Sequence, residues 1–190
     1  MSNIFADDLV LQGDRVTDQK QALSDKTLKI NLNKNIYGSF SEIGAGQETA
    51  RHFFRAGAAS RTIAKAMSAY DKQFSDAIYT TEPDGRYVTE NRLHKMLDHE
   101  VKLLEERLDH TENPKRIYFS YANTVATIDF AKKFKGHGWV GIRFQNEAGG
   151  EFNEIIIHIQ FKENDVLQQQ RTLGTLGVNL IYGAFYQYHD

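Results

Sequence analysis

Two apolar segments near the C-terminal end of the chain are joined by a very short link, and this feature constrains the fold most. GWVGIRFQ (138–145) and NEIIIHIQF (153–161) are separated only by the glycine-rich stretch NEAGGEF. Parallel strands need a crossover of a dozen or more residues, whereas antiparallel strands need only a turn. The sequence therefore predicts an antiparallel strand pair, and with it a sheet that is at least partly antiparallel.

Successive side chains of a strand point to opposite faces of the sheet. On the first segment of the pair, Val140, Ile142 and Phe144 share one apolar face. We expect this face to pack inward, opposite the isoleucines of the second segment at 155, 157 and 159 or their direct neighbours.

The strongest helical pattern lies at 89–110, with a Thr at its start and Asn113-Pro114 beyond its end. A Thr at the N-cap and a Pro after the last turn are typical helix boundaries. The apolar positions recur at helical spacing: Leu93, Met96, Leu97, Val101, Leu104 and Leu108.

The remaining patterns mix short strands with helices. Segments 38–44 and 116–125 indicate strands, 47–57 and 164–188 indicate helices, 74–80 reads as extended, and 61–70 is ambiguous between the two. Such mixing predicts an α/β fold: a single domain whose mixed sheet contains an antiparallel strand pair and has flanking helices. We expect a polar N-terminal arm at 1–35 and the single α/β domain at 36–190.

Composition narrows the class of function. The formal net charge is −2 and the chain has no cysteine, so we expect no nucleic-acid partner, no disulfide and no thiolate nucleophile. The N-terminus lacks the pattern of a secretory signal, and no apolar run reaches the 18 or so residues of a membrane helix. These observations favour a cytoplasmic protein without a membrane partner.

The stretch EIGAG, from Glu42 to Gly46, ends a predicted strand and leads into a predicted helix. Glycines there would let the backbone approach a ligand, while the helix N-terminus offers free N–H groups. In the pattern of Rossmann-type methyltransferases, Asp71 would then accept ribose hydroxyls. The alternative is that Gly44 and Gly46 form only a tight turn, because short glycine motifs often occur by chance.

A second candidate lies on the polar face of segment 137–145. His137, Trp139 and Arg143 share that face, and His158 of the next segment could join them. An arginine near imidazoles and an indole would suit a carboxylate or phosphate ligand. The alternative is a solvated sheet face.

The sequence holds no metal-binding motif. His94 and Asp98 stand one helical turn apart, but two ligands do not make a site. We therefore expect no metal site, and no P-loop or nucleophile elbow is present.

Several blocks along the chain resemble an uncharacterised family of bacterial cytoplasmic proteins. These blocks are SEIGAGQETARHFFRAG, TIAKAMSAYD, SDAIY, RYV, MLDHE and GHGWVGIRFQ, and they span roughly 37–145. Members often carry labels such as nicotinate-nucleotide adenylyltransferase or TonB-dependent receptor. The residues support neither label, because the chain lacks a His-x-Gly-His phosphate site and the length of a 22-stranded barrel. Members are often longer, so the resemblance implies a short form or the N-terminal part of a longer chain.

Three functional hypotheses follow from these patterns. The first is a protein that binds a small anionic or nucleotide-like ligand through Gly44, Gly46, Asp71, His137 and Arg143. The second is a non-enzymatic assembly module that uses the C-terminal helix, so that we expect a homo-oligomer or an additional C-terminal segment. The third is a degenerate methyltransferase-like or nucleotidyltransferase enzyme. No cofactor is indicated.

Overall fold

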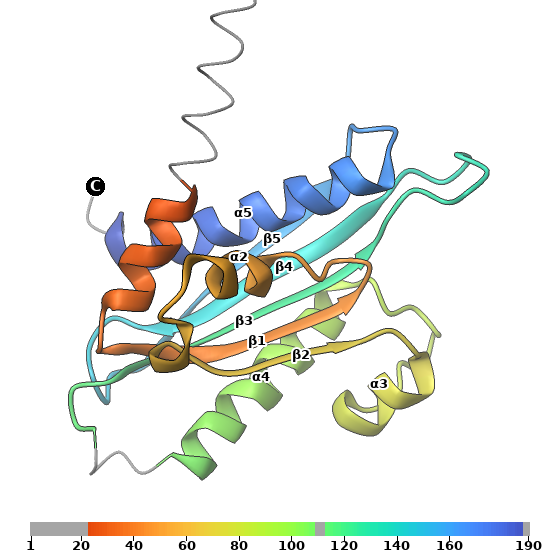
Figure 1. Ribbon diagram of the computed structural model, residues 1–190. Coiled ribbons are helices and arrows are strands. Elements are labelled where there is room, and N and C mark those ends of the chain that lie inside the picture. The colour runs from red at the N-terminus through yellow and green to blue at the C-terminus, as the bar shows by residue number, and fades with distance from the viewer. Residues whose placement is uncertain (1–22, 109–112, 188–190) are drawn as a thin grey trace, which may run out of the picture.

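A five-stranded mixed sheet forms the centre of the computed structural model, which describes residues 23–108 and 113–187 (Figure 1). Its strand order is β2-β1-β3-β4-β5. Strand β1 pairs parallel with both β2 and β3. The pairs β3–β4 and β4–β5 are antiparallel. The predicted α/β fold with an antiparallel pair is therefore confirmed. The strands are β1 (Ile36–Gly44), β2 (Ile63–Ala69), β3 (Ile117–Ala126), β4 (His137–Gln145) and β5 (Phe152–Gln160).

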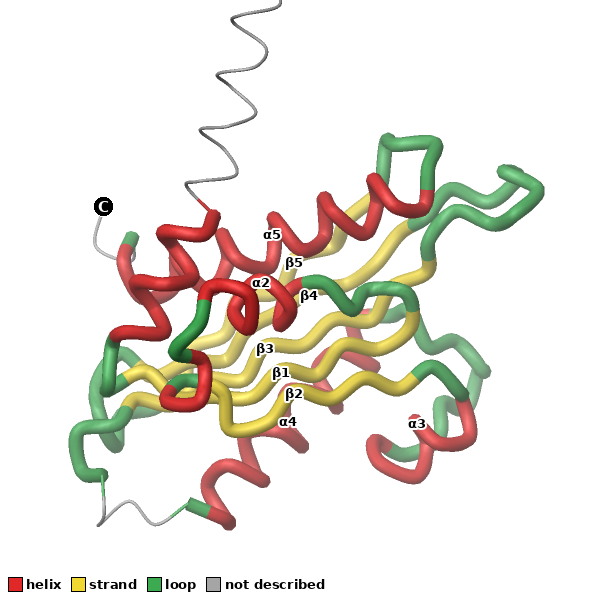
Figure 2. Tube along the Cα trace, viewed as in Figure 1, coloured by secondary structure: helices red, strands yellow, loops and turns green. Residues whose placement is uncertain are grey.

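Helices cover both faces of this sheet, so each face has its own hydrophobic core (Figure 2). On one face lie α2 (Thr49–Ala56) and α5 (Val166–Tyr186), while α4 (Glu90–Arg107) crosses the other with α3 (Lys72–Tyr79) beside it. A short 3-10 turn, Ala59–Arg61, leads into β2.

The helix predicted at 89–110 is confirmed as α4. The Thr89 hydroxyl accepts a hydrogen bond from the Arg92 amide at 3.1 Å and so caps its N-terminus. Its predicted apolar stripe is buried from Leu93 to Leu104. The same buried face also holds two charged residues, Arg92 and Glu100, which apolar periodicity does not predict.

One segment differs from its predicted structure, and the structure of a second, ambiguous segment is now defined. Segment 74–80, expected to be extended, lies almost wholly within α3, because the Asp71 carboxylate accepts from the Phe74 amide at 2.8 Å and starts a helix there. The prediction was wrong because the strand-like composition was outweighed by this cap and by the burial of Ser75 and Tyr79 one turn apart. The ambiguous segment 61–70 contains β2, which pairs with β1 along the sheet edge.

The antiparallel pair has the predicted register. Ile142 lies opposite Ile155 and Val140 opposite Ile157, and the inward face from Val140 to Phe144 is at most 1% exposed. The other face is not a solvated surface along its whole length. Gly141 approaches Leu93 of α4 there, and Gln145 is 5% exposed and donates to the Gly150 carbonyl at 2.8 Å.

The C-terminal helix α5 packs within its own chain. Leu173, Val178 and Ile181 join the core on the sheet, and Gly174 and Gly177 allow close approach to α2. This packing accounts for the apolar composition of the helix without a partner, so its expected self-association stays a prediction. No helix in the described part of the chain has the length and apolar character needed to span a bilayer.

The N-terminal helical segment at residues 23–32 lies within the range expected to form an arm. Ile30 is 0% exposed in the main core, and the Asn31 amide donates to the Phe53 carbonyl at 2.9 Å. The described part of that range therefore packs on the domain, while residues 1–22 lie outside the described residues.

Candidate functional site

The carboxyl end of the parallel strands gathers most of the predicted site residues. Gly44 pairs with Val125 at the end of β1 and β3, and Ala126, the last residue of β3, pairs with His137 at the start of β4. Asp71 follows the end of β2. In open α/β sheets, ligands bind at this end. Arg143 lies nearer the opposite end, where it pairs with Ser120.

The Gly-x-Gly turn is filled by groups of the chain itself. The two carboxylate oxygens of Glu42 accept from the amides of Thr49 and Ala50, at 2.9 and 3.2 Å, at the start of α2. These are the N–H groups that would otherwise hold an anion. Burial raises the pKa of Glu42, although the same amide hydrogen bonds act in the opposite direction. An anion in the turn would have to displace this buried side chain.

Gly44 has a φ of +79°, and a Cβ there would lie 2.4 Å from the Val125 carbonyl oxygen. We expect Gly44→Ala to lower the free energy of unfolding by more than about 1 kcal/mol, because backbone strain adds to a backbone clash. Urea unfolding measures the change. Gly85→Ala is the control. Gly85 also has a positive φ, +68°, but a Cβ there would have no atom within 4 Å, so this change should lower the free energy of unfolding by less. Equal costs at both positions would contradict the packing of the turn.

Gly46 is also closely packed, but by side chains. A Cβ there would lie 2.4 Å from Leu173 Cδ2 of α5 and 2.7 Å from Asn123 Oδ1 of β3. The Asn123 amide also donates to the Gly46 carbonyl at 3.0 Å and to Glu42 at 3.1 Å. Close packing thus gives this glycine a structural role.

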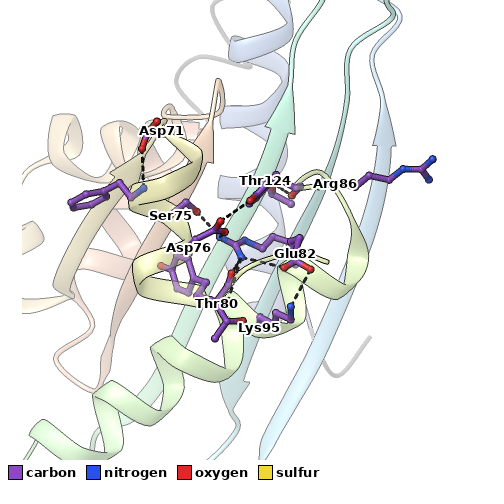
Figure 3. A network of polar contacts seen from close by, with 12 residues as sticks. Asp71, Ser75, Asp76, Thr80, Glu82, Arg86, Lys95 and Thr124 are labelled. Carbon is purple, nitrogen blue, oxygen red and sulfur yellow. Dashed lines mark hydrogen bonds and ion pairs between the residues drawn. The ribbon is translucent and has the colours of Figure 1, made fainter. Parts of the chain in front are cut away.

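A network of polar contacts lies where α3 and the loop after it meet α4 (Figure 3). Arg92 of α4 makes the largest number of these contacts. The guanidinium is 0% exposed and donates to Ser75 Oγ at 2.6 Å and to Glu82 Oε1 at 3.1 Å. Glu82 also forms an ion pair with Lys95 at 3.0 Å. The buried charges of this network are therefore engaged by the chain itself, and they join α3 and the following loop to α4. Asp71, at the edge of Figure 3, serves as the cap of α3.

A second buried polar chain runs beneath the sheet from Ser41 to Lys65. The Ser41 hydroxyl is hydrogen-bonded to the Tyr79 hydroxyl, which donates to Glu100 at 2.9 Å. Lys65 forms an ion pair with Glu100 at 2.6 Å. Ser41 is 0% exposed, so a substrate has no access to this hydroxyl, and the chain serves to neutralise the buried Glu100.

Arg143 of β4 forms ion pairs with one carboxylate of α4 and with one of β5. The guanidinium contacts Asp98 and Glu154, and His94 Nδ1 lies 3.2 Å from Glu154 Oε1. This places Arg143 away from His137 and next to two carboxylates. Among the described residues, no group of three or more His, Asp or Glu side chains could hold a metal ion.

A cavity of about 600 Å³ opens at the end of β5 and contains His137. We call it the histidine cavity. It lies between the β3–β4 loop and the segment that follows β5, which are joined by a hydrogen bond from the Phe161 amide to the Gly136 carbonyl at 3.0 Å. The lining residues are Ile128, Lys135, Gly136, His137, His158, Gln160, Phe161, Lys162, Glu163 and Asn164.

Aromatic contacts fix the two imidazoles of the histidine cavity. The ring centroids of His137 and His158 lie 5.8 Å apart, and His158 stacks on Trp139 at 4.4 Å. Burial, and then repulsion from His158, lower the pKa of His137. A neutral imidazole can both donate and accept a hydrogen bond, while the lysines supply the positive charge.

The one carboxylate among the lining residues is held by its own neighbours. Glu163 accepts from the Thr172 hydroxyl at 2.6 Å and from the Lys162 amide at 3.1 Å, and the Thr172 bond is the main reason for its lowered pKa. Both lysines that line the cavity, Lys135 and Lys162, are exposed. An incoming anion would therefore meet two lysines and two imidazoles.

Sequence patterns identified the imidazole pair but not the lysines. Alternation along 137–145 placed His137 and Trp139 on one face and suggested His158 beside them. Lys135 and Lys162 lie in loops, where no periodicity applies. The pairing of β4 with β5 and the contacts of Gln169 with both loops bring them to one cavity. The carboxylate of Glu42, the first residue of EIGAG, caps α2.

The layered arrangement defines the class: a three-layer α/β/α domain built on a mixed sheet. Solved structures share this fold. A competence or damage-inducible protein from Enterobacter asburiae is similar with a TM-score of 0.60 and 11% identity, over 85% of this chain and 95% of that chain. The protein CihA from Agrobacterium tumefaciens is similar with a TM-score of 0.59 and 12% identity, over 84% and 93%. A CinA superfamily protein from Klebsiella pneumoniae has a TM-score of 0.60 and 9% identity, over 85% and 94%.

These likenesses show the fold alone, because identity is low. No family model matches the sequence, and no curated protein matches it. The resemblance to the bacterial cytoplasmic family thus has no support from a family model.

Proposed function

We propose that this domain binds a small anionic ligand, such as a nucleotide, in the histidine cavity. The observation that carries the proposal is the meeting of His137, His158, Lys135 and Lys162 around one cavity of about 600 Å³. This volume lies within the range of small-molecule sites. Lysine ammoniums attract phosphate or carboxylate groups, and imidazoles add oriented hydrogen bonds.

The surrounding contacts supply the rigidity that binding requires. Gln169 of α5 is 1% exposed, and its side-chain oxygen accepts from the Ile128 amide at 2.8 Å while its nitrogen donates to the Glu163 carbonyl at 2.8 Å. One buried glutamine thus holds the two segments that border the cavity. A preformed site loses less conformational entropy on binding.

The Gly-x-Gly turn contributes indirectly to this proposal. Its donors hold Glu42, and its glycines support the contact between β1, β3 and α5. We place the charged part of the ligand in the histidine cavity rather than at Gly44, Gly46 or Arg143, and we assign no reaction.

Binding of adenosine monophosphate and of inorganic phosphate, measured by calorimetry, tests the proposal. We expect the wild-type chain to bind at least one of these probes, and Lys135→Ala/Lys162→Ala to weaken binding about tenfold or more, because two charge-assisted hydrogen bonds are lost. Lys132→Ala/Lys133→Ala is the matched control, since both lysines are exposed in the same loop and do not line the cavity.

Two outcomes would contradict the proposal. One is the absence of binding by both probes. The other is an equal loss of affinity in the control variant, which would indicate attraction to the charge of the loop rather than to the cavity.

A further inference from the structure

The outer strand β5 is only partly covered by the rest of the described chain. None of its nine residues is buried, whereas most residues of β3 and β4 are. It pairs with β4 along its whole length, from Phe152 to Gln160. Within residues 23–108 and 113–187, no backbone hydrogen bond from β5 reaches any segment on its outer side. Its outward N–H and C=O groups are thus available for pairing.

The edge of β5 also lacks most of the features that usually prevent strands from pairing, and Glu154 is its one acidic residue. Natural edge strands carry lysine or proline, are short, or contain bulges. The sequence FNEIIIHIQ has no lysine, proline or glycine, and its register with β4 is regular. The opposite edge, β2, differs, because it carries Lys65 and its pairing with β1 has an irregularity between Gly38 and Ser39.

We propose that β5 pairs antiparallel with β5 of a second copy of this chain, centred on Ile156, and so joins two sheets into one. A two-fold axis perpendicular to the sheet relates the copies. It places odd-numbered residues opposite odd-numbered residues, and even-numbered opposite even-numbered, on the same face of the sheet. With Ile156 at the axis, Ile155 faces Ile157 of the second copy, and Glu154 faces His158.

The pattern of side chains selects this register. In this register apolar side chains lie opposite apolar side chains, and the Glu154 carboxylate lies opposite the His158 imidazole. Both kinds of cross-strand pair stabilise the pairing of two strands. A shift of the axis to Ile155 would place Glu154 opposite Ile156, and a shift to Ile157 would place Ile156 opposite His158. Glu154 also contacts Arg143 and His94 within its own chain, so its charge is shared and the isoleucine pairs contribute most of the selectivity.

The absence of native cysteine makes the register measurable by cross-linking. Ile156→Cys should form an intermolecular disulfide under mild oxidation, because the Cα atoms of directly opposite residues lie about 4.5–5.5 Å apart, within the range that a disulfide spans. Ile155→Cys and Ile157→Cys should cross-link poorly. In each of these variants the thiol lies diagonal to the same residue of the second copy, at a distance of about 7–8 Å. Light scattering should give a mass of about twice 21.7 kDa for the wild-type chain at about 100 µM.

A charge on the edge provides a second test that does not depend on thiols. Ile155 is 36% exposed, so Ile155→Lys should leave the monomer folded by circular dichroism and weaken the dimer at least about tenfold. Leu32→Lys is the control, because Leu32 is 62% exposed on the N-terminal helical segment and should leave the dimer unchanged.

Three results would overturn the proposal. The first is a wild-type chain that remains monomeric at this concentration. The second is a dimer in which Ile156→Cys does not cross-link faster than both neighbours. The third is a dimer that a folded Ile155→Lys variant retains. Failure of this proposal is distinguishable from failure of the ligand proposal, because the ligand measurements use variants of Lys135 and Lys162, which lie outside β5.

Discussion

Replacing Arg92 with methionine is expected to lower the free energy of unfolding by about 3–5 kcal/mol, because it leaves a buried carboxylate without its main partner. Arg92 is 0% exposed, and Glu82 beside it is 4% exposed. After the change, Glu82 retains only Lys95 and the weaker amide bond from Asn91 at 3.3 Å. The carbonyl of Thr80 also loses a donor. Urea unfolding followed by circular dichroism measures the loss.

Lys102→Met is the matched control for Arg92. Lys102 lies on the same helix, its side chain is 74% exposed, and its ion pair with Glu106 spans 3.7 Å. Exposed pairs of this kind contribute about 0–1 kcal/mol. A cost for Arg92→Met no larger than that for Lys102→Met would show that the network in Figure 3 does not hold α3 against α4.

Truncation of Ile142 to alanine should cost about 2–5 kcal/mol, because it opens a cavity in a closely packed core. Ile142 is 0% exposed and lies between Tyr121 of β3 and Ile155 of β5. Leu167→Ala is the control, since Leu167 is 51% exposed at the start of α5 and should change stability by about 0.5 kcal/mol or less. Thermal and urea unfolding give the comparison. A change at Ile142 below about 0.5 kcal/mol would place this face of β4 in solvent.

Local sequence determines the elements that were predicted correctly. A six-residue link permits only antiparallel pairing of β4 and β5, and the apolar period of α4 extends over several turns. The helix α3 was missed because it has only eight residues and depends on contacts distant in sequence. Its Ser75 hydroxyl accepts from Arg92, which belongs to the next helix.

The candidate site was predictable in the same uneven way. Alternation suffices to place His137 on the same face as Trp139, and strand pairing adds His158. The role of Glu42 could not be read from its position before the glycines, because a buried carboxylate at a helix N-terminus and an empty ligand cradle have similar local sequences. The cavity itself depends on two loops whose positions are set by Gln169 of α5.

The imidazole signals in a nuclear magnetic resonance titration test the ligand proposal most directly. Adenosine monophosphate is added at constant pH while His137, His158 and His52 are observed. His52 reports on the alternative site, because it lies in the first turn of α2, the helix that follows the Gly-x-Gly turn, and its ring packs against Gly174 of α5. We predict saturable shifts of His137 and His158 with His52 unchanged. Shifts of His52 alone, or no shift of the two cavity histidines at saturation, would contradict the assignment of the ligand to the histidine cavity.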